Sequence, residues 1–250
     1  MEQTHVPWLG PRYWAALYMA SIFGANSGDF FAHGVGLGHV AGLPFLALAL
    51  AAVLIVERFD SFAHQIHYWL AIVIVRTAAT NFADFFSVDL RLAKIWVMLA
   101  LTVVLILAIW FSWRLLWSRR KDDGAARAPL LQADVPYWFC MFAAGTLGTV
   151  LGDYCSHDWH LGNAGASLFL SAALTVLVLI GRGRILWSLP FYWTTIVMIR
   201  AAGTVIGDFF ASRNMLGLPL STLITGILFV GLLIVWKEPS PRRAALVSDP

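Results

Sequence analysis

The sequence has few charged residues and almost no cysteine. Charged residues make up 12% of the 250 positions, hydrophobic residues make up 60%, and the mean hydropathy is +0.75. This composition excludes an ordinary soluble domain. The net charge of +3 gives no reason to expect nucleic-acid binding. Cys140 and Cys155 lie on one predicted helix about 22 Å apart by helical rise, which is too far for a disulfide.

Several functional motifs are also missing. The GxxxxGK[ST] motif that binds ATP phosphates does not occur, and neither do the nucleophile motifs of hydrolases. Any transport is therefore expected to be secondary or passive. No basic region with a small-residue cleavage site precedes the first apolar segment, so we expect no cleavable signal. The apolar runs are continuous rather than alternating, which excludes a transmembrane β-barrel.

What the sequence does have is eight apolar segments. Each has about 17–21 residues, enough to cross a hydrocarbon core of about 30 Å. They are Tyr13–Phe31, Val40–Val56, Tyr68–Val88, Ile95–Trp113, Tyr137–Cys155, Ala164–Ile180, Phe191–Ala211 and Leu216–Trp236. The predicted fold is an all-α integral membrane protein with eight transmembrane helices.

The basic residues predict an orientation in the membrane. With eight spans, 12 of the 17 lysines and arginines fall on the side that holds both termini. The opposite side holds only Arg91, Lys94 and Arg213. By the positive-inside rule, both termini are then cytoplasmic.

One motif occurs four times. In each copy a Tyr-Trp pair opens an apolar segment, and an aspartate follows the Trp by fifteen residues. The pairs are Tyr13-Trp14, Tyr68-Trp69, Tyr137-Trp138 and Tyr192-Trp193, and the aspartates are Asp29, Asp84, Asp153 and Asp208. An aspartate inside an apolar helix costs about 3 kcal/mol or more. Four of them at one repeated position indicate a functional site.

The spacing of the copies predicts two halves. The copies begin 55, 69 and 55 residues apart, which is a pair of pairs. Residues 1–117 then form the first half, residues 118–133 a polar cytoplasmic linker, and residues 134–237 the second half. Residues 238–250 are expected to be a disordered tail. Because every copy contributes two spans, the halves should be related by a pseudo-two-fold axis along the membrane normal.

The four copies resemble a family of uncharacterised bacterial membrane proteins built from four tandem two-helix repeats of unknown function. The resemblance covers nearly the whole chain, from Pro11 to Trp236, and the Trp-to-Asp spacing is specific to it. It implies the eight-span layout and a location in the bacterial inner membrane. It implies no substrate, cofactor or site residue.

Residues four apart share a helix face, so positions can be compared in four-residue steps from each aspartate. Eight residues earlier stand Ser21, Arg76, Gly145 and Arg200, and four residues earlier stand Ala25, Thr80, Thr149 and Thr204. We therefore predict one polar ion-binding site between the halves. Its residues are Asp29, Asp84, Asp153, Asp208, Arg76, Arg200, Thr80, Thr149 and Thr204.

Charge counting indicates a cation. Four aspartates less two arginines leave two negative charges, which a divalent cation, two protons, or protonated His33 and His157 would balance. Each of these histidines follows an aspartate by four residues. An Asp/His pair at that spacing can bind Mn, Fe, Co, Ni or Zn. We predict a metal site of Asp29, His33, Asp153 and His157 toward the outer face.

Three functions stay open from the sequence. The first is a transporter of a small cation, with a divalent metal favoured, whose partners are the bilayer and the ion. The second is a membrane b-type cytochrome, an oxidoreductase, with haem on His33 and His157. The third is a structural or sensor protein in which Arg76 and Arg200 form buried pairs with aspartates. We favour the first, hence no enzyme, and leave a homo-oligomer open.

Two further residue types have alternative interpretations. The four repeated Trp residues are typical of the membrane interface. Six glycines close to the aspartates either allow close helix packing or mark broken helices that line a cavity. Packing is favoured for these glycines, which are Gly24, Gly28, Gly148, Gly152, Gly203 and Gly207.

Overall fold

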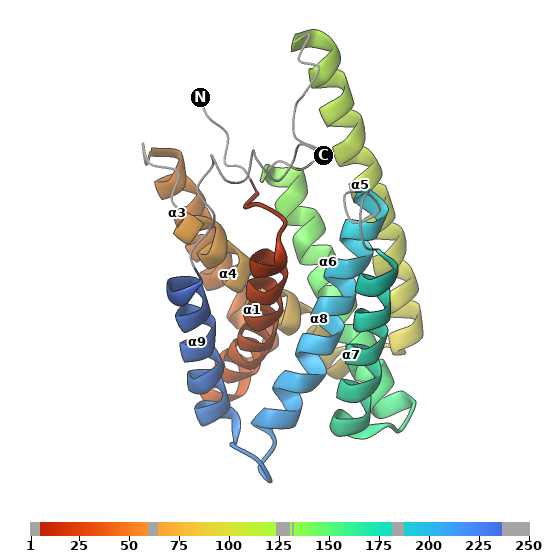
Figure 1. Cartoon of the computed structure of the whole chain (residues 1–250). Coiled ribbons are helices and arrows are strands. Elements are labelled where there is room, and N and C mark those ends of the chain that lie inside the picture. Colours follow the sequence, from red (N-terminus) through yellow and green to blue (C-terminus); the bar gives the residue numbers. More distant parts are fainter. Residues whose placement is uncertain (1–5, 60–64, 124–130, 132, 182–187, 237–250) are drawn as a thin grey trace.

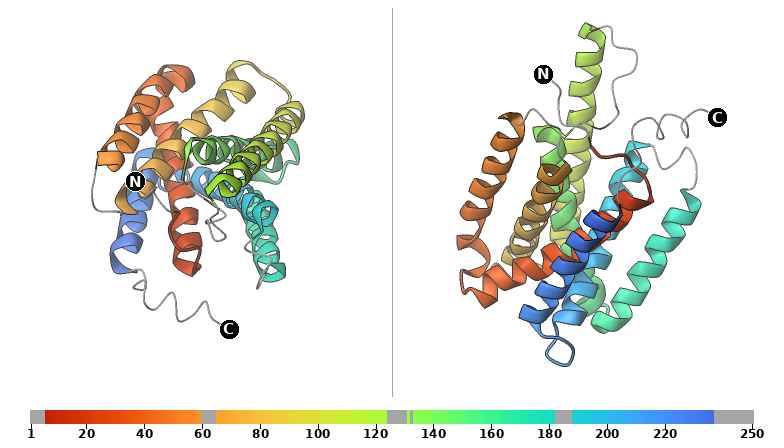
Figure 2. Two further views of the ribbon diagram at one scale, coloured as in Figure 1. Left: turned by 90° about the horizontal axis from the view of Figure 1, so that it is seen from above. Right: turned by 60° about the vertical axis from the view of Figure 1, so that its left-hand side comes forward.

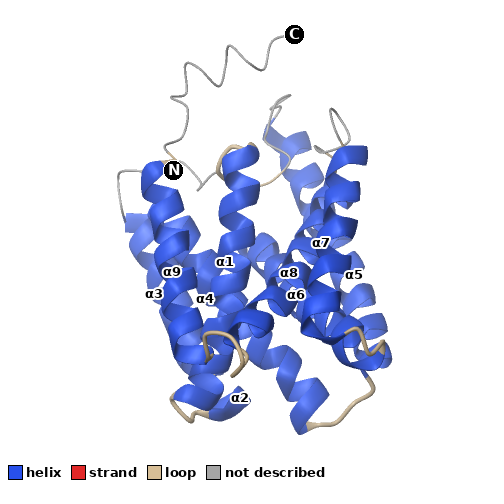
Figure 3. Ribbon diagram, turned by 60° about the horizontal axis from the view of Figure 1, so that its bottom comes forward, coloured by secondary structure: helices blue, strands red, loops and turns tan. Residues whose placement is uncertain are grey.

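A computed structural model describes residues 6–59, 65–123, 131, 133–181 and 188–236. All regular secondary structure in these ranges is helical (Figures 1 and 3). One long helix begins each copy of the motif: α1 (Pro11–Asp29), α4 (Gln65–Asp84), α6 (Val135–Asp153) and α8 (Leu189–Ala211). A second long helix follows each: α3 (Leu43–Phe59), α5 (Lys94–Asp123), α7 (Gly162–Ile180) and α9 (Leu218–Val235). The short helix α2 (Gly38–Ala41) precedes α3.

The first helices of the four copies form an inner ring. α1 packs against α4 and α8, and α6 also packs against α4 and α8. Each second helix packs outside the ring on the first helix of the following copy: α3 on α4, α5 on α6, α7 on α8, and α9 on α1. Viewed from above, α3, α5, α7 and α9 lie at the periphery (Figure 2). Each copy therefore contacts the next one, and the fourth copy contacts the first.

Arg12, at the start of α1, bonds to the outer helix α9 and to the inner helix α4. Its guanidinium donates to the backbone carbonyls of Trp236 and Leu233 at the end of α9. It also donates to Gln65 Oε1 at the start of α4, at 3.0 Å. A basic residue expected at the cytoplasmic surface thus connects the start of α1 to two neighbouring helices.

The helices have the character of a multi-pass membrane protein. Seven described helical segments are long and apolar enough to cross a bilayer: every long helix except α1. Between 11% and 17% of each outer helix is buried, against 50–72% for α4, α6 and α8. The outer helices thus present apolar surface, as lipid-facing helices do. α1 has 19 residues but contains Ser21, Asn26 and Ser27, so its span stays a prediction.

Helix α5 differs from the predicted boundaries. It continues to Asp123, beyond the expected end of the span at Trp113 and into the predicted linker. Residues 124–130 and 132 of that linker lie outside the described residues, as does the predicted tail 238–250. The pseudo-two-fold relation between the halves stays a prediction, because cyclic contacts among four helices do not fix a symmetry axis.

The six glycines are packing positions. All of them lie within regular α-helix, and a Cβ atom built on any of them would come within 3.0 Å of a neighbouring helix. At Gly24 it would lie 2.5 Å from Cγ of Arg76, and at Gly148 it would lie 2.4 Å from Cβ of Arg200. The favoured packing interpretation is confirmed at these positions, because each missing side chain allows two inner helices to approach closely.

Candidate functional site

A cavity of about 560 Å³ lies at the end of the inner ring where α1, α4 and α6 finish. All four repeated aspartates line it, one from each inner helix. The other lining residues are His33, His39, Thr80, Ser87, Val88, Lys94, Thr149, His157, Asn163, Thr204, Ala211, Ser212 and Leu218. The structure thus brings the four predicted carboxylates to one place, far from the end where α1 begins. Whether they bind an ion stays a prediction.

A π-helical turn follows the aspartate in three copies. Asp29, Asp84 and Asp153 are each the last residue of an α-helix, and the π-helical segments Phe30–Gly34, Phe85–Asp89 and Tyr154–Asp158 begin immediately after them. In the fourth copy α8 stays α-helical to Ala211. The sequence analysis did not identify these turns. π-helical turns are rare and occur often at functional sites, where they re-aim side chains.

The cavity opening is surrounded by paired polar groups. Nζ of Lys94 donates to Oδ2 of Asp158 at 2.7 Å, and Nδ1 of His39 lies 3.0 Å from Oδ1 of Asp89. The rings of His33 and His39 are in edge-to-face contact, with centroids 5.2 Å apart. Lys94 was not predicted at the site, because its sequence position carries no four-copy pattern.

The predicted metal site is not preformed. Asp29, His33, Asp153 and His157 all line the cavity. Within the ranges that the structure describes, however, no three His, Cys, Asp or Glu side chains are grouped closely enough to hold a metal ion. Nδ1 of His157 instead lies 3.1 Å from the backbone carbonyl of Asp153. The four side chains surround a space rather than converging on one point.

The threonine layer (Thr80, Thr149 and Thr204) lies one turn below the aspartates and also lines the cavity. Arg76 donates to all three hydroxyls, at 2.8, 2.6 and 2.6 Å. Its Nε donates to Ser21 Oγ at 3.3 Å. The fully buried guanidinium of Arg76 therefore lies immediately beneath the cavity and places one positive charge there.

Arg200, at the equivalent position of the fourth copy, has no such partners. Its side chain is fully buried, and Nε, Nη1 and Nη2 form no hydrogen bond. Its guanidinium lies within electrostatic range of the hydroxyls of four tyrosines. The predicted Asp–Arg pairs are wrong: the hydrogen bonds of Arg76 go to hydroxyls and a carbonyl, and no ion pair joins either arginine to an aspartate among the described residues.

The tyrosine ring (Tyr13, Tyr68, Tyr137 and Tyr192) closes the opposite end of the inner helices. Its four hydroxyls are hydrogen-bonded in a cycle, with O···O distances of 2.9, 2.6, 3.0 and 2.7 Å. All four side chains are fully buried. The first residue of the motif thus forms hydrogen bonds with the same residue of the two neighbouring copies.

The repeated Trp residues pack against the side chains of the tyrosine ring. Trp69 packs against Tyr13, Trp138 against Tyr68, and Trp193 against Tyr137, with ring centroids 5.6–5.8 Å apart. Trp14 packs against Tyr192 at 5.7 Å. Trp69, Trp138 and Trp193 are buried within the protein, and their predicted depth at the membrane interface stays a prediction. Aromatic contacts between neighbouring copies account for their position.

The positions of the motif form successive layers. Stepping back from each aspartate by four residues gives the threonine layer, then the two arginines, then a fully buried apolar layer, then the tyrosine ring. The apolar layer consists of Leu17, Ile72, Met141 and Ile196. A rise of 1.5 Å per residue places the tyrosine positions about 24 Å from the aspartates. The interior is thus polar at one end and closed by aromatic and apolar groups at the other.

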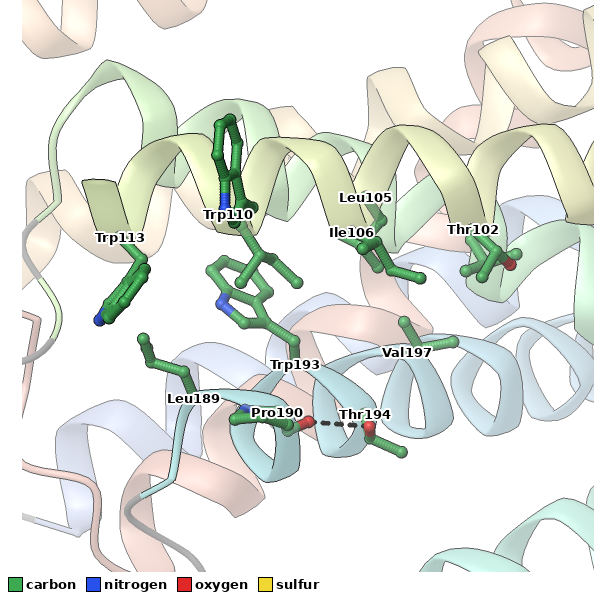
Figure 4. A pocket seen from close by; sticks show the side chains of 12 residues that line it. Thr102, Leu105, Ile106, Trp110, Trp113, Leu189, Pro190, Trp193, Thr194 and Val197 are labelled. Atoms are coloured by element: carbon green, nitrogen blue, oxygen red, sulfur yellow. Dashed lines mark hydrogen bonds between the residues drawn. The ribbon is translucent and has the colours of Figure 1, made fainter. Parts of the chain in front are cut away.

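A second cavity, of about 630 Å³, lies on the outside of the bundle between α5 and α8 (Figure 4). Its walls include Leu105, Trp110 and Trp193, and the hydrogen bond drawn there joins the hydroxyl of Thr194 to the carbonyl of Pro190. Its lining has no carboxylate, imidazole or amine. This groove has the properties of a lipid-facing surface and offers no chemistry comparable to that of the aspartate cavity.

Comparison with known proteins identifies the repeat. No curated protein and no solved structure matches the chain. A family described as Repeat of Unknown Function (DUF347) matches residues 12–59, 136–182 and 191–238. These three segments hold the first, third and fourth copies of the Tyr-Trp…Asp motif and together make up more than half of the sequence. The chain belongs to this uncharacterised repeat family.

Proposed function

We propose that the protein is a secondary or passive membrane transporter of a small cation, with a divalent metal ion as the first candidate. The observation that carries the proposal is that four carboxylates, one from each inner helix, line one cavity that is open at one end of the bundle. The other end of the same four helices is closed by the tyrosine ring. A binding site with access from one side only is the arrangement that alternating-access transport requires.

The local charge supports a cation. Among the described residues none of the four aspartates forms an ion pair, and Arg76 is the one cation directly beneath them. Four ionised carboxylates in one cavity repel each other, and an ion pair, a bound proton or a bound metal cation relieves that repulsion. A positively charged ligand therefore gains more from this cavity than a neutral or negative one.

The size of the cavity supports a hydrated ion. About 560 Å³ exceeds the volume of a bare metal ion many times. Mg²⁺ loses its water reluctantly and is commonly held through one or two carboxylates and several retained waters. Carboxylates spread around the cavity, with hydroxyls of the threonine layer below them, suit a cation that keeps part of its hydration shell.

The proposal includes a membrane topology. α1 would be the eighth span, since it packs within the inner ring beside α4 and α8. The distribution of basic residues would place both termini in the cytoplasm, and the bacterial inner membrane is the corresponding location. The aspartate cavity would then open to the outside. Cysteine accessibility of loop positions on either side of the membrane tests this orientation.

The main test combines binding and transport for an Asp29→Asn/Asp153→Asn variant. Asparagine keeps the size of each side chain and removes its charge, so Mg²⁺ and Mn²⁺ binding by calorimetry should be lost with little loss of fold. Flux of the same ions into proteoliposomes should fall to background. The matched control is Asp134→Asn at the start of α6, far from the cavity, where asparagine also serves as an N-cap. Its binding and flux should equal those of the unmodified chain.

Two outcomes would favour the other functions. Equal ion binding and flux in the Asp29→Asn/Asp153→Asn variant and the unmodified protein would return the aspartates to a purely structural role. A Soret band in the absorption spectrum of the purified protein, lost on replacing His33 or His157, would instead support the cytochrome.

A further inference from the structure

Arg200 is the one feature of the interior that the binding cavity does not explain. A guanidinium is always charged and carries five N–H donors. All three nitrogens of Arg200 lack hydrogen-bond partners, and the surrounding side chains leave them inaccessible to water. A buried charge without partners strongly destabilises the state that contains it. Any state of the molecule that hydrates this guanidinium is therefore favoured by it relative to the closed one.

The equivalent arginine shows what Arg200 is missing. Arg76 bonds to three threonines and to Ser21 of the preceding copy. The preceding copy offers Arg200 only Gly145 at the place of Ser21, and Ala25 stands at the place of a fourth threonine. The threonine layer is already occupied by Arg76, and a second guanidinium beside it would meet a like charge.

The groups that keep water from Arg200 are those of the closed end. The tyrosine ring lies at that end, and the buried apolar layer, with Ile196 one turn before Arg200, lies between the ring and the arginines. The guanidinium of Arg200 lies within electrostatic range of all four ring hydroxyls. Those hydroxyls are bonded to one another and not to Arg200. Separating the four copies at both the ring and the apolar layer would therefore admit water to the guanidinium.

We propose that the tyrosine ring is the gate at the closed end of the transport path and that Arg200 promotes its opening, because its charge is hydrated only when the gate is open. The closed state is held by the cycle of four hydroxyl hydrogen bonds and by the Tyr–Trp contacts between copies. The open state gains the hydration of one guanidinium. The inference rests on the proposed function, since the gate would release toward the termini a cation bound at the aspartates.

Labelling of a cysteine just inside the tyrosine ring tests the gate. The reporter is Met141→Cys in the apolar layer, with Cys140→Ala and Cys155→Ala removing the native thiols. In proteoliposomes without added divalent cation, a water-soluble maleimide should label this cysteine slowly. Adding Arg200→Met should lower the labelling rate roughly tenfold or more, because the open state loses the hydration of a charge. Arg200→Lys should keep most of the rate, and Tyr192→Phe should raise it.

The matched control is Arg76→Met, the same change at the equivalent position of the second copy. The guanidinium of Arg76 is fully bonded in the closed state, so its loss should not lower the labelling rate. An Arg200→Met rate equal to or above that of the reporter would overturn the proposal. So would a reporter that is never labelled. Labelling needs no transported ion, so a normal labelling pattern without cation flux would count against the proposed function and not against the gate.

Discussion

The two ends of the inner ring are built from the same four helices, but one end holds an open cavity and the other end is closed. At one end four aspartates surround a cavity, and at the other four tyrosines meet in a closed cycle of hydrogen bonds. An ionised carboxylate only accepts hydrogen bonds, whereas a tyrosine hydroxyl both donates and accepts. Four carboxylates therefore repel one another and leave space for a ligand, while four hydroxyls satisfy one another and exclude it.

The two buried arginines between these ends divide in the same way. Arg76 bonds to the threonine layer that lines the aspartate cavity. The guanidinium of Arg200 has no hydrogen bond and lies within electrostatic range of the tyrosine ring. The two arginines stand at equivalent positions of the motif but have different neighbours. The copies beside Arg76 provide Ser21 and Thr149, whereas the copies beside Arg200 provide Gly145 and Ala25 at the corresponding positions.

The largest difference is expected between Arg76→Met and Arg200→Met. Arg76→Met leaves several buried hydroxyls without their donor and should lower the free energy of unfolding by about 3 kcal/mol. Arg200→Met removes an unpartnered buried charge and should leave stability unchanged or raise it by about 1–4 kcal/mol. Denaturation in mixed micelles, followed by tryptophan fluorescence, measures both. Equal losses would contradict the different roles of the two arginines.

A smaller effect is expected from filling the contact beside Arg200. In Gly148→Ala the new Cβ would lie 2.4 Å from Cβ of Arg200 and 2.9 Å from the backbone oxygen of Val197. Neither atom lies at the flexible end of a side chain, so neither can move away easily. We therefore expect the unfolding free energy to fall by about 1–3 kcal/mol. The control is Gly231→Ala in α9, where no atom lies within 4 Å of the added Cβ. It should be neutral or stabilising by up to about 1 kcal/mol. The same loss of stability in both variants would show that helix propensity, rather than close packing, determines the effect of the added methyl group.

The smallest effect is expected from one hydroxyl of the tyrosine ring. Tyr68→Phe removes the hydrogen bonds to Tyr13 and Tyr137, and should lower the unfolding free energy by about 1 kcal/mol. The control is Tyr18→Phe, whose hydroxyl has one partner, Ser171, at 3.3 Å. It should cost less. A Tyr68→Phe variant as stable as the unmodified chain would show that aromatic packing alone closes this end.

The sequence predicted much of the site because the motif is periodic. The equal Trp-to-Asp spacing predicts four aspartates at one depth, and the structure places all four around one cavity. Four-residue steps on a helix also identified the threonines beside them. Lys94 was missed because it reaches the cavity from the segment that follows Asp84, where the copies differ in sequence.

The helical membrane class, the repeat and the relative depth of each carboxylate could be predicted from the amino-acid sequence, because they follow from composition and from the fixed rise of a helix. Which side chains meet depends on tertiary packing. The tertiary structure places the tyrosines against one another and buries Trp69, Trp138 and Trp193 between copies. It also bonded Arg76 to hydroxyls instead of carboxylates and left Arg200 without a partner. These contacts join different copies of the motif, and one missing hydroxyl there changes the partner of a buried charge. The spacing of residues along a single helix does not predict such contacts.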